Sequence, residues 1–356
     1  MKVDKDKLQK VLSVVNKVVA PKSTLPILSN VLFADDYVAA TNLDVGIGCK
    51  FDSDINTTIP AKLLTELVRS FGGDEIEMIH NEATEETDVI CGNTKTVIKC
   101  VSSVEYPSVQ PGSSWYNDAT SLSINTDVLV KSIKQVVIVS ATDISRPILT
   151  GVYIDISGNV LTMAAADGYR LSVKTETTND SEAITVIVPA ESLKIVAQVA
   201  QGKTCNIHTR HNQIMFDFGD VWVISQVLEG NFPDYKQIIP EETSATTEVN
   251  RIEFTNALKV AKLFSTTNIV ILDIKEGKMK INSSASDVGH QETVLDVETN
   301  GEPVRIAFNV VYLLDGLDLW GDETITLSTG ASNAPGVLSN GKDDLIYVLM
   351  PMRISK

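Results

Sequence analysis

Helices and strands are predicted in the same order three times along this chain of 356 residues. Each third opens with a helical stretch, at residues 7–15, 128–136 and 257–264. A second helical stretch follows at 60–68, 189–196 and 308–315, which places equivalent positions 129 and 119 residues apart. A repeat of this length is too long for a solenoid and indicates repeated domains. The alternative is chance similarity, which would have to produce one order three times at nearly constant spacing.

Strand-like segments follow every helical stretch. Apolar and polar residues roughly alternate in them, with Gly, Asn and Asp at the turns, which is typical of hairpins. After the first helices they are 25–36 with 37–51, 146–159 with 160–176, and 268–278 with 279–297. After the second helices they are 74–81 with 94–102, 205–218 with 221–230, and 323–330 with 345–352. This order predicts an α+β fold in which each domain packs two helices on antiparallel sheets.

Polar, small residues at 110–118 and 241–247 are typical of linkers and predict domains at 1–118, 119–245 and 246–356. Capping-type residues precede two of the opening helices, Thr126-Asp127 and Thr255-Asn256. Pro60 and Pro189 stand where a proline in the first turn of a helix is tolerated. We therefore expect three similar domains joined by short polar segments.

The net charge of −16 argues at first against a nucleic-acid partner. The acidic residues are unevenly spread, however. Windows around the six helices (2–19, 60–70, 126–140, 189–200, 255–265 and 308–320) hold twelve Lys and Arg against seven Asp and Glu. The helices thus carry +5 and the rest of the chain −21. A ring with basic helices on its inner wall and an acidic outside reconciles these values with DNA binding. Lys-rich helices also arise from helix propensity alone, which is the competing interpretation.

No apolar run approaches the length of a membrane span, and the first residues lack the core of a signal peptide. We therefore expect a cytoplasmic protein without a membrane partner. The four cysteines form no CxxC pair, which fits reduced thiols.

Motifs for catalysis are missing from the sequence, which has no phosphate-binding glycine loop, no HExxH and no GxSxG. Cys205, His208 and His211 resemble a metal cluster, but on a strand a spacing of three places neighbours on opposite faces. The pairs Asp35-Asp36 and Asp343-Asp344 are typical of solvated turns, with metal binding the minor alternative. We expect no catalytic residue, no metal and no cofactor.

Four stretches together are similar to one known family: Leu25–Asn30, Ala166–Leu171, Gly230–Tyr235 and Val348–Arg353. They resemble the bacterial DNA polymerase III β subunit, the sliding clamp, in the same order and over the whole chain. The resemblance implies a head-to-tail homodimer of three-domain protomers that encircles double-stranded DNA. It also implies that the chain tethers the replicative DNA polymerase and other proteins with clamp-binding motifs, and that a clamp loader places it on DNA.

The same resemblance implies a groove for partner peptides between the second and third domains. Exposed apolar side chains give such a groove an adaptable surface, while Arg170 and Arg353 can bind peptide carbonyls or an acidic end. For any single apolar residue, packing in the core is the alternative. Ala166, Tyr169 and Gln237 depart from the residues usual in the family, which concerns peptide preference. The sequence does not fix where the loop 333–337 lies relative to the groove. The groove residues expected are Leu149, Gly168, Tyr169, Arg170, Leu171, Pro233, Gln237, Ile238, Asn309, Tyr312, Val348, Met350, Pro351, Met352 and Arg353.

For DNA, the resemblance implies that Lys22 and Lys62 face the duplex. For the dimer, it implies that the strand 94–99, with Lys95, Thr96 and Val97, pairs with a strand of the partner's third domain. Leu263 and Phe264 would pack against it. Two other classes stay open from the residues alone: an enzyme, and a repetitive adhesion or scaffold protein that does not bind DNA.

Overall fold

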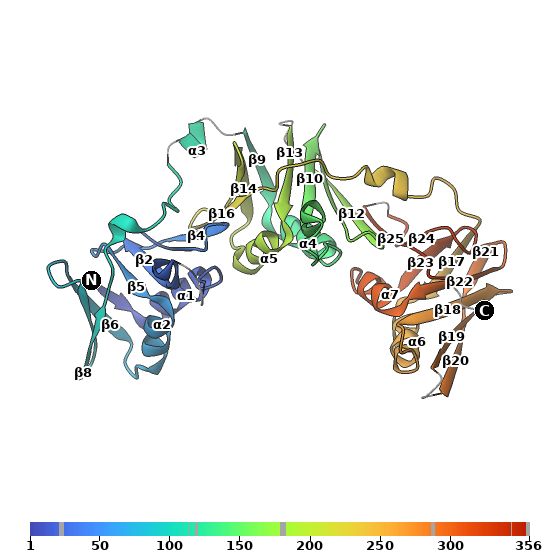
Figure 1. Ribbon diagram of the computed structural model, residues 1–356, viewed down its shortest axis with the longest axis horizontal. Helices are drawn as coiled ribbons and strands as arrows, with labels where there is room; N and C mark the ends of the chain where they lie inside the picture. The colour runs from blue at the N-terminus through green and yellow to red at the C-terminus, as the bar shows by residue number, and fades with distance from the viewer. Residues whose placement is uncertain are drawn as a thin grey trace. The chain divides into compact units, whose positions relative to one another are not determined.

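The computed structural model describes residues 1–20, 25–112, 114–117, 120–178, 183–285, 289–342 and 344–353 (Figure 1). The chain forms two compact units. One comprises Met1–Val130, Asn179–Ile184 and Glu191–Val227, and the other Lys131–Thr178, Thr185–Ala190 and Leu228–Lys356. Within the described residues, each unit contains one long antiparallel sheet and one four-stranded antiparallel sheet.

The threefold repeat of the sequence is present in the order of the elements. In the first two thirds, a strand and a helix are followed by four strands, a second helix and three strands, and the last third has the same order with one strand added. The first third has β1 (Lys2–Asp4), α1 (Lys5–Val15), β2 (Asn30–Ala34), β3 (Tyr37–Thr41), β4 (Val45–Lys50), β5 (Thr57–Pro60), α2 (Ala61–Ser70), β6 (Glu75–Asn81), β7 (Glu86–Cys91) and β8 (Thr94–Lys99).

The second third has β9 (Thr120–Asn125), α4 (Thr126–Val137), β10 (Gly151–Ser157), β11 (Val160–Ala166), β12 (Arg170–Thr177), β13 (Ile184–Pro189), α5 (Ala190–Val199), β14 (Thr204–Arg210), β15 (Gln213–Asp217) and β16 (Val221–Gln226). The short α3 (Ser114–Asn117) precedes it.

The last third has β17 (Ala245–Asn250), α6 (Arg251–Leu263), β18 (Ile269–Lys275), β19 (Lys278–Ala285), β20 (Gly289–Asp296), β22 (Val304–Asn309), α7 (Val310–Leu317), β23 (Thr324–Thr329), β24 (Gly336–Ser339) and β25 (Leu345–Leu349). It differs from the other two by the additional strand β21 (Glu298–Gly301).

The six predicted helices are confirmed, but their first residues and caps differ from expectation. Helix α6 begins at Arg251 rather than near Ala257, because Asn250 caps it by accepting hydrogen bonds from the Ile252 and Glu253 amides. The expected cap Thr255-Asn256 therefore lies inside the helix.

At α4 the cap is the preceding Asn125, whose Oδ1 accepts from the Asp127 and Val128 amides, and not Thr126-Asp127. Pro60 and Pro189 end the preceding strands, so each lies one residue before its helix rather than in the first turn.

The strands are more numerous than predicted. Segments 37–51, 160–176 and 279–297 each contain two strands, so every opening helix is followed by a three-stranded meander rather than a hairpin. In the first two meanders the missed breaks are tight turns at Asn42–Asp44 and Asp167–Tyr169, in which an Asx side chain satisfies the backbone amides that follow it.

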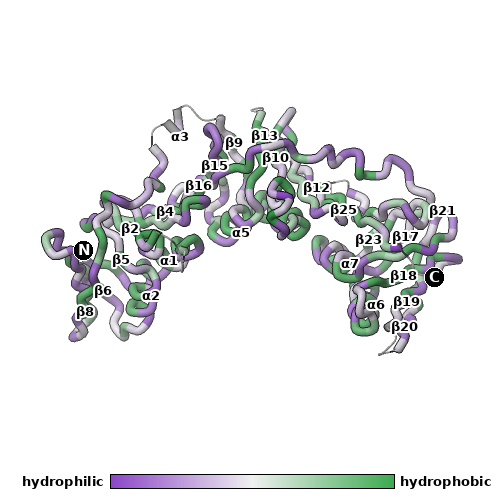
Figure 2. Tube along the Cα trace, viewed as in Figure 1, coloured by the Kyte–Doolittle hydropathy of each residue, from purple (hydrophilic) through white to green (hydrophobic). Residues whose placement is uncertain are grey.

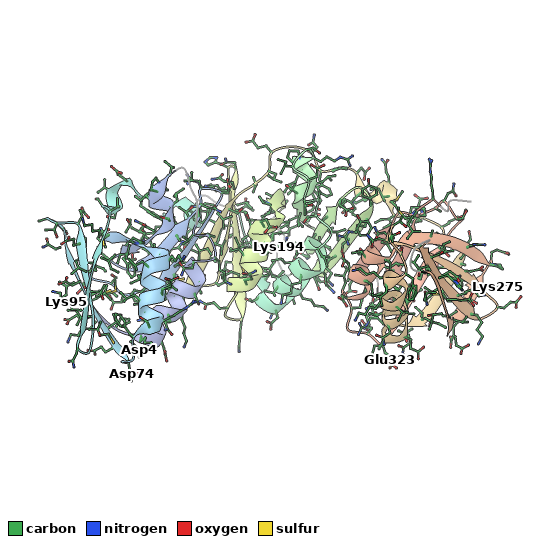
Figure 3. The ribbon with its side chains drawn as sticks, turned by 60° about the horizontal axis from the view of Figure 1, so that its bottom comes forward. Asp4, Asp74, Lys95, Lys194, Lys275 and Glu323 are labelled. Atoms are coloured by element: carbon green, nitrogen blue, oxygen red, sulfur yellow. The ribbon has the colours of Figure 1, made fainter. Side chains whose placement is uncertain are left out.

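In the first unit, α1 and α2 pack on each other and on strands β1 to β5 (Figure 1). Leu8, Leu12 and Val15 of α1 are buried, and they recur at the spacing of one helix face. Asp4 caps α1 by accepting from the Lys7 amide at 2.9 Å. Asp4 lies beside Asp74 (Figure 3). The backbone carbonyl of Asp74 accepts a hydrogen bond from the amide of Lys5, the residue that follows Asp4. Burial of the helix faces against the sheets fixes the fold of this third.

Each long sheet continues from one third of the repeat into the next. In the first unit β4 pairs with β16, with Gly46 opposite Ile224, and the strand order is β5-β2-β3-β4-β16-β15-β14-β9. In the second unit β12 pairs with β25, with Leu171 opposite Val348, and the order is β13-β10-β11-β12-β25-β24-β23-β17-β21. The segment after β16, which contains Pro233 and Gln237, is mostly hydrophilic (Figure 2).

Candidate functional site

A pocket of about 350 Å³ lies in the second unit, where β12 and β25 join. Segments from four places in the sequence meet there: the turn before β12, the segment after β16, the loop before β24, and the end of β25. Its lining residues are Ala166, Gly168, Arg170, Leu171, Gln237, Ile238, Pro335, Val348 and Met350. Seven of these nine were expected from the sequence, and the structure brings them together.

The floor of the pocket belongs to a buried apolar cluster. Ala166, Leu171 and Val348 pack there with Tyr235. At the rim, Met350 and Ile238 are 39% and 37% exposed. A buried floor with partly exposed, flexible apolar side chains at the rim is suited to accept the apolar side chains of a ligand.

The turn before β12 shapes one wall of the pocket. Oδ1 of Asp167 accepts hydrogen bonds from the amides of Tyr169 and Arg170, at 2.8 and 3.0 Å. Gly168 has φ 91°, a conformation that favours glycine. A Cβ at this position would lie 3.0 Å from Nη1 of Arg146. Arg146 therefore borders this wall, although the sequence analysis did not include it.

Arg170 is held by groups of the chain itself. Its guanidinium donates to Asp167 at 2.9 Å, to Asp315 at 2.6 Å, to the Tyr347 hydroxyl at 3.2 Å and to the Ile138 carbonyl at 3.1 Å. It also stacks over the Tyr312 ring, 4.2 Å from the centroid. The sequence suggested that Arg170 could bind a peptide directly. In the structure four of its five N–H donors bond within the chain, which ties the turn to α7, and Arg170 still lines the pocket, so its contact with a peptide stays a prediction.

Tyr169, Tyr312 and Asn309 lie beside the pocket rather than in its lining. The rings of Tyr169 and Tyr312 lie 6.5 Å apart, and Tyr169 is 59% exposed. Asn309 caps α7 by accepting from the amides of Val311 and Tyr312. Asn309 thereby positions the first turn of α7, from which Tyr312 extends.

The remaining expected residues lie outside the pocket lining. Leu149 is half-buried and its carbonyl accepts from the Ala141 amide. Pro233 is exposed and Pro351 half-buried. The Met352 amide donates to the Ala307 carbonyl at 2.7 Å, which leads the tail along β22. Arg353 lines a different depression, of about 530 Å³, on β18, β19, β20 and β22.

Two of the lining residues were not in the expected set. Ala166 was noted only as a departure from the family, and Pro335 belongs to the loop 333–337 whose place the sequence did not fix. Gln237 is an expected residue, and its side-chain amide donates to Asp234 at 2.9 Å.

The expected interface residues lie at edges and on exposed surfaces. Strand β8 is an edge of the four-stranded sheet β1-β6-β7-β8. On it, Val97 is 53% exposed and Lys95 forms an ion pair with Asp88 at 2.7 Å, while Thr96 is half-buried. Leu263, at the end of α6, is 74% exposed, and Phe264 is half-buried. Lys62 is exposed on α2, and Lys22 lies outside the described residues.

Comparison with known proteins identifies the family. Three models of the DNA polymerase III beta subunit match consecutive parts of the chain: the N-terminal domain at residues 1–110, the central domain at 123–234, and the C-terminal domain at 236–353. The chain belongs to this family.

Full-length relatives agree with this assignment. The beta sliding clamp of Synechococcus elongatus is 29% identical over 366 residues, covering 96% of both chains. That of Streptococcus pneumoniae R6 is 26% identical over 379 residues, covering 99% of this chain and 98% of its own.

Among solved structures, the DNA polymerase sliding clamp of Bacillus subtilis matches with a TM-score of 0.93 at 23% identity, covering 99% of both chains, which shows the fold. A sliding clamp of Pseudomonas aeruginosa, solved with griselimycin bound, matches with a TM-score of 0.92 at 25% identity over 99% of both chains.

As a member of the DNA polymerase III beta subunit family, the chain has the three-domain α+β clamp fold and is a non-catalytic processivity factor of that polymerase. The alternatives of an enzyme and of an adhesion or scaffold protein are therefore set aside.

The three residues that resemble a metal cluster in the sequence have different surroundings in the structure. Cys205 and His208 are buried on β14, and His211 is an exposed residue of the following turn. Burial raises the pKa of Cys205 and lowers that of His208, although Asp217 opposes the shift at His208. Among the described residues no three His, Cys, Asp or Glu side chains are arranged to hold a metal ion. Within the same residues, no helix is long and apolar enough to cross a membrane.

Proposed function

We propose that this chain closes with a second copy, head to tail, into a ring around double-stranded DNA. On the ring it tethers the replicative polymerase, the clamp loader and other proteins with clamp-binding motifs through the pocket at β12 and β25. The clamp loader places the ring on DNA. The observation that carries the tethering proposal is the partly exposed apolar pocket, built from four distant segments in a chain of the beta subunit family.

The strand order supports head-to-tail closure. Within the chain, the last strand of one meander pairs with the last strand of the next domain: β4 with β16, and β12 with β25. Continuing this series, β20 at the end of the third meander pairs with β8 of a partner. Both β20 and β8 are edge strands of their sheets. Edge strands expose unpaired backbone groups, and pairing in a closed ring covers them.

Charge supports DNA as the partner. The six helices as the structure bounds them carry eleven Lys and Arg against six Asp and Glu, although the whole chain has a net charge of −16. Among the basic residues, Lys62, Lys131 and Lys259 are exposed. Exposed basic side chains on helices provide non-specific phosphate contacts. We keep Lys22 and Lys62 as the proposed DNA-facing residues.

The proposed domains remain 1–118, 119–245 and 246–356. Strand β17, which opens the third repeat, starts at Ala245, one residue before the last of these boundaries. We also propose that the chain works in the cytoplasm, in keeping with its family of bacterial replication proteins.

Calorimetric titration with a short peptide containing Gln, Leu and Phe tests the pocket. Met350→Ala removes an exposed apolar side chain from the rim, and we expect at least tenfold weaker binding. The matched control is Met279→Ala, which changes the same residue type at a fully buried position on β19, outside the pocket. If the peptide binds the wild-type chain and binds Met350→Ala with the same affinity, the assignment of the pocket is contradicted.

A further inference from the structure

The junction of β4 and β16 in the first unit repeats the backbone of the groove at β12 and β25. In the groove, Asp167 Oδ1 accepts from the amides two and three residues later, and Met350 N donates to the Tyr169 carbonyl at 2.9 Å. In the first unit, Asn42 Oδ1 accepts from the amides of Asp44 and Val45, and Gln226 N donates to the Asp44 carbonyl at 2.9 Å. The same hydrogen bonds thus build both places.

The register of the strands shows which residue of the β4–β16 junction corresponds to which residue of the β12–β25 junction. Thr41 opposes Gly46 as Ala166 opposes Leu171. Gly46 opposes Ile224 as Leu171 opposes Val348. Gln226 is at the position equivalent to Met350, and Gln213 opposes it. Gly336 opposes Leu349, so Pro335 comes opposite Met350, and Gln213 therefore corresponds to Pro335.

A pocket of about 260 Å³ lies at this first junction. Its lining residues are Thr41, Leu43, Asp44, Gly46, Ser108, Val109, Gln110, Trp115, Gln213, Ile224 and Gln226. Six of them occupy positions equivalent to lining residues of the groove, so the repeat of domains has produced a repeat of the pocket.

The chemistry of the two linings differs. Met350 is replaced by Gln226, Pro335 by Gln213 and Ala166 by Thr41. The side-chain amides of Gln110, Gln213 and Gln226 have no hydrogen-bond partner in the part of the chain that the structure describes. Each amide offers both donors and an acceptor, which complements the amides and hydroxyls of a polar peptide.

The charge of the lining limits the kinds of ligand that this pocket can bind. Asp44 is the charged residue of this lining, and no Lys or Arg is among the described residues that line the pocket. An acidic peptide or a phosphate group would be repelled there. Charge therefore excludes acidic ligands, and the three glutamine amides of the lining favour a neutral polar segment.

Leu43 adds an independent observation. It corresponds to Gly168 and has the same left-handed conformation, with φ 81° against 91°. A branched side chain adopts this conformation at a steric cost. The hydroxyl of Thr41 and the side chain of Asn42 hold the turn by accepting from the amides of Leu43, Asp44 and Val45. Leu43 is nevertheless 49% exposed, at the rim of the pocket.

We propose that the pocket at β4 and β16, which we call the first pocket because it comes first along the chain, is a binding site in addition to the groove. It takes a short extended peptide segment bearing amide or hydroxyl side chains. The inference rests on the proposed function of the groove, because the shared backbone is what marks the pocket as a peptide site. The two sites would then select partners of different chemistry with one framework.

The test uses the full chain and three peptides. The probe is acetyl-Gln-Ser-Gln-Asn-Gln-amide, and its acidic counterpart acetyl-Glu-Ser-Glu-Asp-Glu-amide is the matched control. Acetyl-Gln-Leu-Ser-Leu-Phe-amide reports on the groove. Calorimetry measures each affinity, and tryptophan fluorescence, to which Trp115 in the lining of the first pocket contributes beside two other tryptophans, responds when the neutral peptide binds there.

We expect the neutral peptide to bind saturably and to change the tryptophan fluorescence. The acidic peptide should bind with at least tenfold lower affinity. Gln213→Ala with Gln226→Ala should weaken the neutral peptide at least tenfold and leave the apolar peptide unchanged. Met350→Ala should weaken binding of the apolar peptide at least tenfold and leave binding of the neutral peptide unchanged. Leu43→Gly relieves the strained conformation, so it should keep the thermal midpoint while weakening the neutral peptide.

Binding of the apolar peptide without binding of the neutral one would overturn this inference and leave the proposed function standing. Binding of the neutral peptide that is insensitive to Gln213 and Gln226 would also overturn it. Failure of the apolar peptide alone would contradict the groove and not the first pocket.

Discussion

At the scale of single residues, seven of the residues expected in the groove line one pocket, but the contacts of each side chain could not be predicted from the sequence. The resemblance to the sliding-clamp family was enough to expect Leu171, Val348 and Met350 at one site, and all three line the pocket. The same information suggested Arg170 as a peptide contact, whereas its guanidinium is engaged by Asp167, Asp315, Tyr347 and Ile138. These partners lie up to 177 residues away along the chain, and only the tertiary fold brings them together.

Tyr106 links local chemistry to the stability of the first unit. Its hydroxyl donates to the Asn30 carbonyl and accepts from the Thr41 amide. Burial raises the pKa of Tyr106 to about 12, from a usual value of 10.0. The unfolded chain therefore loses this proton at lower pH than the folded chain. The stabilisation is complete below pH 10 and is lost as pH rises towards 12.

We expect Tyr106→Phe to lower the free energy of unfolding by about 1–2 kcal/mol at pH 8, through the lost hydrogen bonds. Two pH units correspond to about 3 kcal/mol, so the difference from wild type should fall to zero between pH 10 and 12 and then change sign. Urea denaturation over this pH range measures it. Tyr169→Phe is the control, because its ring is 59% exposed. A difference that stays constant with pH would refute the role of burial at Tyr106.

At the scale of elements, helices were predicted more successfully than strands. The apolar spacing of a helix extends over several turns, so all six helices were found within the repeat. Strands β7 and β24 were missed between stronger neighbours, and β24 has only four residues. The joins of β4 to β16 and of β12 to β25 depend on contacts between distant segments, which alternation along one strand does not encode.

The proposed closure through β8 and β20 predicts the effect of changes at the end of α6. Leu263→Asp with Phe264→Asp places two charges where an exposed apolar side chain is proposed to pack against the partner. Uncompensated buried charges cost several kcal/mol, so the double variant should be monomeric in analytical ultracentrifugation. Ile144→Asp with Val160→Asp, at exposed positions outside β8, β20 and α6, should stay dimeric. Sedimentation of the Leu263 and Phe264 variant as a dimer would show that the interface is elsewhere.

At the scale of the whole molecule, we propose that a ring retains the chain on DNA by topology rather than by affinity. Its net charge of −16 does not favour tight electrostatic binding of nucleic acid, and the basic residues of the helices are proposed to provide only labile contacts. A closed ring needs no tight contact, since it leaves DNA only by opening or by sliding off an end.

The most direct measurement is retention on circular DNA after loading by a clamp loader, followed by cutting of the circle with a restriction enzyme. Gel filtration separates the chain bound to DNA from the free chain before and after the cut. We predict that the chain stays with the circle through moderate salt and is released once the DNA is linear. Retention that is equal on circular and linear DNA, and that falls with salt alone, would contradict the ring.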